Sequence, residues 1–183
     1  AKHNRVAMVN LAAVGHFLDA LTRASDLGLL QDAVLAQSEK ERAAFWAIRD
    51  NIESLAVLWP LAIFDISLPL ATMEAYLERT GARLAQRLGE LRWVTFGHLG
   101  DSNLHLAIAL GGDDPDLRHA VEEIVYGELA GIGGSVSAEH GIGLEKREFL
   151  HCSRSDAEIE LMKTLKRALD PRNILNPARI FRL

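Results

Sequence analysis

The chain has 183 residues, of which 49% are hydrophobic and 25% charged, and this composition excludes a mainly disordered protein because enough apolar surface is present to offset chain entropy. Its formal net charge of -5, from 20 Lys and Arg against 25 Asp and Glu, argues against nucleic acid as a partner, which would require a basic stripe. The length fits one domain, or one domain with an appendage.

The first half of the chain predicts helices and strands in turn. Apolar residues at helical spacing predict an amphipathic helix over residues 7–23. Residues 29–35 are strand-like, and Ser38 is the expected N-cap of a helix that continues to Ile52. Residues 61–68, bounded by prolines on both sides, predict a strand near an edge of a sheet.

The second half predicts two more strands and three helices. Helical apolar patterns cover 70–88 and 117–129, and strands are expected at 93–96 and 103–110 around a turn-rich segment. Ser155 and Glu158 form a capping box that opens a helix ending before Pro171. This order predicts an α+β fold, in which helices cover one face of a mostly antiparallel sheet within residues 1–153 and a helical tail follows at 154–183.

Cysteine content and hydropathy indicate the cellular compartment that we expect for the protein. Cys152 is the single cysteine, so the fold does not depend on an intramolecular disulfide. No run approaches the roughly 20 apolar residues of a membrane span, and the first ten residues lack the apolar core of a signal peptide. We therefore expect a cytoplasmic protein, with peripheral membrane association left open. The chain begins at Ala1 without Met, so we also expect a fragment or a processed product.

A first candidate site lies in GHLGDSNLH, residues 97–105. His98 and His105 are seven residues apart, so on one regular strand they would lie on opposite faces. Gly100 to Asn103 are turn formers that can reverse the chain, which would bring both imidazoles to one point. Converging imidazoles are a ready pair of ligands for a divalent transition metal.

A second candidate lies in GGSVSAEHGIG, residues 133–143. Glu139 could complete a two-histidine, one-carboxylate metal site with open coordination positions. His140 could act as a general base, because histidine titrates nearest neutral pH. From spacing alone, a metal site is only slightly favoured over surface histidines in ordinary loops.

Basic residues offer a third candidate. Arg49, at the end of a predicted helix, could hold a carboxylate in bidentate fashion. A surface ion pair with Asp50 or Glu53 is the other interpretation, and spacing alone favours it. Lys146 and Arg147 are expected to form a solvated basic turn.

Five ordered segments carry a resemblance to a known family. The sequence resembles the C-terminal, substrate-binding domain of FAD-linked oxidases in the vanillyl-alcohol oxidase / para-cresol methylhydroxylase superfamily, within the D-2-hydroxyacid dehydrogenase branch. The resemblance covers roughly residues 31–180. The segments are QDAVLAQSEKERAAFWAIRDNI, FDISLP, TFGHLGDSNLHL, GGSVSAEHGIGLEKREFL and LKRALDPRNILNPARI.

The resemblance implies a ferredoxin-like α+β cap domain, whose tail returns to a flavin domain, and an enzyme that oxidises a D-2-hydroxy acid with hydride transfer to FAD. It implies that His98, His105 and Glu139 bind a divalent metal, usually zinc and sometimes manganese or iron. His140 would abstract the hydroxyl proton and Arg49 would hold the substrate carboxylate. The expected contacts with the cofactors come from Asn103, Glu139, His140 and Asn176.

Departures from the family pattern bear on the substrate. Ser102 replaces a common glycine in the turn, and Ala178 and Arg179 replace the usual Gly-Lys of the last motif. The hydroxyglutarate branch tends to carry Thr, Lys and Asn where this chain has Glu53, Ile63 and Ala107. We therefore expect D-lactate or a similar monocarboxylate rather than D-2-hydroxyglutarate.

The glycine-rich FAD-binding domain of the family does not occur in these residues. We expect it in the same parent chain, and we expect the isolated chain to bind FAD poorly and to be inactive. An electron acceptor and a homodimer are further expected partners. Two alternatives are a metal-dependent hydrolase that uses the same three ligands, and an inactive binding or assembly module.

Overall fold

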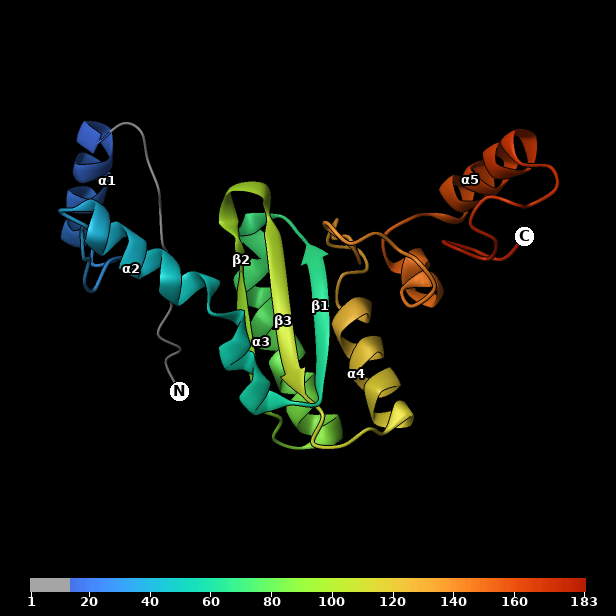
Figure 1. Cartoon of the computed structure of the whole chain (residues 1–183), viewed down its shortest axis with the longest axis horizontal. Helices are drawn as coiled ribbons and strands as arrows, with labels where there is room; N and C mark the ends of the chain where they lie inside the picture. The colour runs from blue at the N-terminus through green and yellow to red at the C-terminus, as the bar shows by residue number, and fades with distance from the viewer. Residues whose placement is uncertain (1–13) are drawn as a thin grey trace. The chain divides into compact units, whose positions relative to one another are not determined.

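The computed structural model describes residues 14–183 (Figure 1). It divides into two compact units, with the boundary between Ser54 and Leu55. The predicted helix at 7–23 is observed as α1, Val14–Asp26, and the rest of that prediction lies outside the described residues. No helix in the described part of the chain is long and apolar enough to cross a membrane.

The N-terminal unit contains α1 and α2, Glu39–Asp50. Ser38 caps α2 by accepting a hydrogen bond from the Glu41 backbone N–H, as its position predicts. The strand expected at 29–35 is wrong, because these residues form an irregular segment with exposed apolar side chains. A short apolar run becomes a strand only when another strand pairs with it, and the described residues of this unit contain none.

The second unit is built on a three-stranded antiparallel sheet of β1, Leu61–Ser67, β3, Asn103–Ala109, and β2, Trp93–His98, in that spatial order. The short helix η1, Ile52–Leu58, precedes β1. The helix α3, Leu70–Leu88, joins β1 to β2, and α4, Pro115–Gly127, follows β3. This β-α-β-β-α order confirms the predicted α+β class with an antiparallel sheet.

Helices α3 and α4 cover one face of the sheet. Phe64 of β1 and Leu106 of β3 are buried in one core cluster with Tyr76 of α3 and Val125 of α4. The Tyr76 hydroxyl donates a hydrogen bond of 2.9 Å to the Val125 carbonyl, which ties the two helices together. The residues alternating with this core therefore face the other side of the sheet, which we call the open face. The helix η1 packs on its apolar end, where Ala107 is buried in a second, smaller core.

Register fixes three rows of side chains across the open face. One row holds Ser67, Asn103 and His98; the next holds Asp65, His105 and Phe96; the third holds Ile63, Ala107 and Val94. The face is thus polar at one end and apolar at the other. A fourth strand is reduced to an isolated antiparallel bridge between Ser67 and Ser135 at the free edge of β1.

The chain ends with η3, Arg147–Cys152, and α5, Asp156–Leu169, followed by an irregular tail. The predicted capping box is present, because Ser155 and Glu158 each bond the other's backbone N–H. Leu161, Leu165 and Leu169 recur every four residues on α5 and remain exposed.

Candidate metal centre

The turn between β2 and β3 brings His98 and His105 to one face of the sheet. It consists of η2, Leu99–Asp101, and Ser102, whose φ of 65° is left-handed. This is the position where glycine is common in the family pattern, and serine adopts the same strained conformation here. The Asp101 carboxylate accepts a 3.2 Å hydrogen bond from the Asn103 N–H and closes the turn. The two imidazole centroids lie 6.0 Å apart.

Glu139 lies between the two histidines. Its Oε1 is 4.0 Å from Nε2 of His98, and its Oε2 is 4.0 Å from Nε2 of His105. The three candidate ligand atoms all lie within 4.8 Å of one another. Tetrahedral zinc with bonds of about 2.1 Å separates neighbouring ligand atoms by about 3.4 Å, so this donor set fits a divalent ion after small side-chain movements. Asp65, Glu139 and His140 form a second group of similar compactness.

Asp65 of β1 organises the loop that carries Glu139 and His140. Its Oδ2 accepts hydrogen bonds of 2.9 Å from both backbone N–H groups. The side chain is 1% exposed. No sequence pattern described above assigned this role to Asp65. The available signal was a carboxylate at the centre of a buried strand, since such a group must find donors.

The environment of Lys146 differs from the predicted one. This residue was expected in a solvated turn, but it is 7% exposed. Its Nζ lies 3.6 Å from Asp65 Oδ2 and donates hydrogen bonds to the Asp65 carbonyl and the Ser137 hydroxyl. A buried carboxylate is stable only when paired, and this pairing draws the lysine inside. Arg147 is not buried, and its guanidinium donates to the Ala178 carbonyl.

The charges of the cluster follow from burial and hydrogen bonding. Burial by itself raises the pKa of Asp65, but the backbone N–H groups of His140 and Glu139 and the nearby Lys146 outweigh it, so the net pKa lies below its usual value. Burial lowers the pKa of His105 more than Asp65 and Glu139 raise it. His105 is therefore a neutral imidazole at neutral pH, which is the form that binds a metal.

The remaining predicted residues of this unit lie in distinct settings. His140 is exposed, with Nδ1 3.8 Å from Asp65 Oδ2. Asn103 is buried on the open face, and within the described part of the chain neither polar atom of its side chain has a hydrogen-bond partner. Asn176 lies in the exposed tail with a left-handed φ of 47°. The tail bonds back to the loop after His140, because the Ile180 N–H donates to the Gly143 carbonyl.

Arg49 lies on α2 in the N-terminal unit. Its guanidinium donates a 2.8 Å hydrogen bond to Asp50 and lies 5.7 Å from the centroid of the Trp46 ring. The ion pair with Asp50 is the arrangement that sequence spacing favoured. The role of Arg49 as a substrate ligand remains a prediction.

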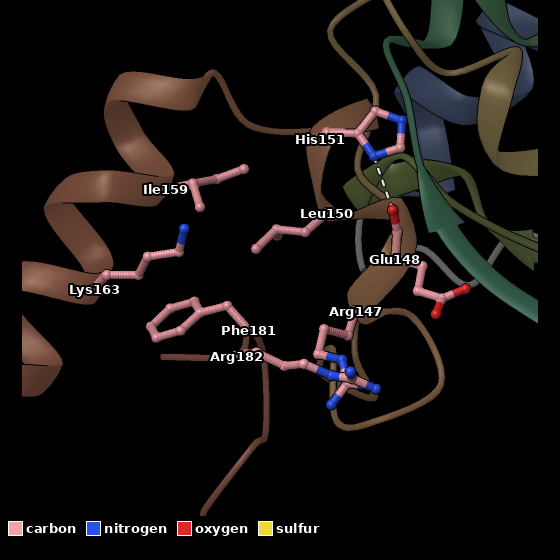
Figure 2. Close-up of a pocket in the computed structure, with 8 residues that line it drawn as sticks. All are labelled: Arg147, Glu148, Leu150, His151, Ile159, Lys163, Phe181 and Arg182. Atoms are coloured by element: carbon pink, nitrogen blue, oxygen red, sulfur yellow. Dashed lines mark hydrogen bonds between the residues drawn. The ribbon is translucent and has the colours of Figure 1, made fainter. Parts of the chain in front are cut away.

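A separate open hollow of about 430 Å³ lies between η3, α5 and the C-terminal tail (Figure 2). Figure 2 shows Phe181 and Lys163 on one side and the side chains of Arg147 and Arg182 on the other. None of the predicted site residues lines it.

Comparison with known proteins gives consistent matches. The family described as "FAD linked oxidases, C-terminal domain" matches residues 4–180. "D-2-hydroxyglutarate dehydrogenase" of Stutzerimonas stutzeri is 38% identical over 84% of this chain and 34% of its own length. The mitochondrial "D-2-hydroxyglutarate dehydrogenase" of Bos taurus is 38% identical over 90% of this chain and 29% of its own.

A third relative carries a different substrate in its name. A mitochondrial Schizosaccharomyces pombe protein named "Putative D-lactate dehydrogenase" is 36% identical over 81% of this chain and 30% of its own length. The chain thus spans about a third of the length of the relatives it matches.

Proposed function

The chain belongs to the family of FAD-linked oxidase C-terminal domains, and we propose that it is the substrate- and metal-binding half of a flavoenzyme that oxidises a D-2-hydroxy acid to the 2-oxo acid. The observation that carries the proposal is the convergence of His98, His105 and Glu139 on the open face, beside His140. A hydrolase with the same ligands has no observation of its own in its favour.

The three candidate ligands support a bound metal, and the buried side chain of Asn103 supports a contact with FAD or the substrate. A divalent metal, zinc above all, would be held by His98, His105 and Glu139 and would make the substrate hydroxyl more acidic. FAD, held mostly by another domain of the parent protein, would supply the two-electron acceptor. Asn103 is suited to a polar edge of the cofactor or substrate, because its buried side-chain amide has no hydrogen-bond partner in the described residues.

His140 is the proposed base. Its Nδ1 faces Asp65, so Nε2 remains to accept the hydroxyl proton of the substrate. The C–H hydrogen then leaves with its electron pair, and the alcohol carbon becomes the carbonyl carbon. Arg49 is proposed to hold the substrate carboxylate, and Asn176 to contact the flavin.

We propose a monocarboxylate such as D-lactate as the substrate. The third row of the open face is apolar, with Ile63 52% exposed and Val94 39% exposed. None of the three strands contains Lys or Arg, so the sheet presents no cation to a second carboxylate. Ala107 is completely buried and offers no donor. The competing hypothesis is D-2-hydroxyglutarate as the substrate, because two of the quoted relatives are named for it.

The exposed leucines of α5 support an interface between the tail, residues 154–183, and the FAD-binding domain. The electron acceptor, a homodimer and a cytoplasmic location stay predictions, and several relatives are named as mitochondrial.

The test is turnover by the flavin-loaded parent protein. D-Lactate and D-2-hydroxyglutarate would each be supplied with an artificial electron acceptor, and bound zinc would be counted by elemental analysis. We expect oxidation of D-lactate, its loss in His140→Asn with folding retained, and about one metal ion per chain. Absence of turnover with every 2-hydroxy acid would overturn the activity, while preference for D-2-hydroxyglutarate would overturn only the substrate.

A further inference from the structure

We propose that Asp65 is a positioning residue, which orients the metal ligand His105 through one carboxylate oxygen and the segment Glu139-His140 through the other. The inference rests on the proposed function, because it concerns the same centre. It gives Asp65, which also belongs to the second candidate metal group, a role other than that of metal ligand or base.

The place of Asp65 in the sheet puts it against His105. The two residues are Cα partners in the pairing of β1 with β3, so their side chains rise from the same face. His105 is also fixed from its other side, where it stacks on Phe96 with ring centroids 5.0 Å apart. The imidazole therefore lies between Phe96 on one side and Asp65 on the other.

The first oxygen of the carboxylate is aimed at His105. Oδ1 of Asp65 is buried, has no hydrogen-bond partner among residues 14–183, and lies 4.0 Å from Nδ1 of His105. The other ring nitrogen, Nε2, faces Glu139. A carboxylate behind one ring nitrogen, with the second nitrogen turned to the metal, is the arrangement that fixes the tautomer of a metal-binding histidine. A closer approach of about 1 Å would complete the hydrogen bond.

The second oxygen holds the loop. Oδ2 of Asp65 accepts the N–H groups of Glu139 and His140 and lies 3.8 Å from Nδ1 of His140. One atom thus fixes the backbone from which both the third metal ligand and the base project. Because Asp65 is also the strand partner of His105 across β1 and β3, these hydrogen bonds place the loop relative to His105.

A purely structural role is the competing explanation, since Lys146 pairs with the same carboxylate. Asp170 provides a matched control for it. Asp170 is also buried, accepts backbone N–H groups from Ile174 and Leu175, and pairs with a lysine, Lys166, but it lies in the tail loop and outside both candidate metal groups.

The experiment compares Asp65→Asn and Asp170→Asn in the 183-residue chain, with folding checked by circular dichroism. Two readouts need no metal: amide hydrogen exchange at Glu139 and His140, and the ¹⁵N shifts of the His105 ring. A third readout is the affinity for Zn²⁺, measured by competition with a chromophoric chelator.

We expect Asp65→Asn to speed exchange of both amides by about tenfold, because a neutral amide oxygen is a weaker acceptor than a carboxylate. The ring proton of His105 should move from Nδ1 to Nε2, since the new side chain can donate to Nδ1. Zinc affinity should fall by about 10- to 100-fold. Asp170→Asn should leave all three readouts at their wild-type values.

Unchanged exchange and tautomer in a folded Asp65→Asn chain would overturn the proposal. If the wild-type chain binds zinc, an equal zinc affinity of the variant would also overturn it. If the wild-type chain binds no zinc while exchange and tautomer still change in the variant, Asp65 positioning stands and the metal centre of the proposed function falls. If Asp65→Asn does not fold, the double variant Asp65→Asn/Lys146→Met removes the unpaired cation, and the same expectations apply to it.

Discussion

Oδ2 of Asp65 and Nζ of Lys146 lie 3.6 Å apart, and both side chains are almost completely buried. The pair joins β1 to the segment before η3, across 81 residues of sequence. Burial lowers the pKa of Lys146, and the carboxylate of Asp65 acts against that shift. Each charge is therefore held inside the protein by the other.

Removing the cation should cost more stability than removing an exposed one. We expect Lys146→Met to lower the free energy of unfolding by about 3 kcal/mol, because the Asp65 carboxylate would remain buried without its counter-ion. Urea unfolding at pH 7 measures the change. Lys163→Met, which breaks the surface pair with Glu160, is the control and should have a much smaller effect. Equal losses in the two variants would contradict a special role for the buried pair.

The candidate ligands should bind metal as a set. We expect His98→Ala to reduce the affinity of the chain for Zn²⁺ by at least about 100-fold, since a three-ligand site that loses one imidazole retains only two protein donors. Isothermal titration with Zn²⁺ measures this. His119→Ala is the matched control, because His119 is an exposed histidine on α4 beside Glu122 and Glu123. If both variants bind the metal equally well, the metal site does not include His98.

The hairpin that carries the two histidines was predictable from the sequence, while the buried pair of Asp65 and Lys146 was not. Turn formers between His98 and His105 allow the chain to reverse, and this signal is local in the sequence. Asp65 and Lys146 are buried, whereas aspartate and lysine side chains are usually exposed. Their burial depends on a contact between segments far apart in the sequence, which composition and periodicity do not report. The false strand at 29–35 has the same cause, since pairing is a long-range property.

Close packing at Gly97 ties the hairpin to the metal centre. A Cβ atom at Gly97 would lie 2.3 Å from the Asn103 carbonyl oxygen, which is backbone and cannot rotate away. We expect Gly97→Ala to lower the free energy of unfolding by about 2 kcal/mol and to weaken zinc binding, because β2 must move beside His98. Gly112→Ala has open space around the new atom and should be nearly neutral. Chemical denaturation and zinc titration of both variants give the comparison.

Glu128 should make stability depend on acid pH. Burial raises the pKa of Glu128, but hydrogen bonds from Arg83 and Arg79 of α3 outweigh this and lower it below the ordinary value. A carboxyl group with a lowered folded-state pKa adds stability above its unfolded pKa, and this contribution is lost as the pH falls through the folded pKa.

Glu128→Gln should therefore reduce stability at pH 7 by about 1 kcal/mol, a value kept small by the half-exposed arginines. The difference from the wild type should shrink as the pH falls from about 4.5 toward 3. Urea unfolding at pH 7 and pH 3 measures both points. A difference that does not change with pH would show that the ion pairs contribute nothing through charge.

The apolar row of the open face offers a test of substrate choice. Ile63 projects from β1 two residues before Asp65, so a cation there would lie beside the candidate centre, within reach of the far end of a bound dicarboxylate. The measurement compares kcat/KM for D-2-hydroxyglutarate with kcat/KM for D-lactate in the flavin-loaded parent protein. We expect Ile63→Lys to raise the ratio of the first to the second by about tenfold. This corresponds to one exposed charge-assisted contact of roughly 1.4 kcal/mol. The control is Leu70→Lys, which adds the same charge at an equally exposed position at the start of α3. If both variants shift the ratio alike, the change reflects net charge, and the third row does not contact the substrate side chain.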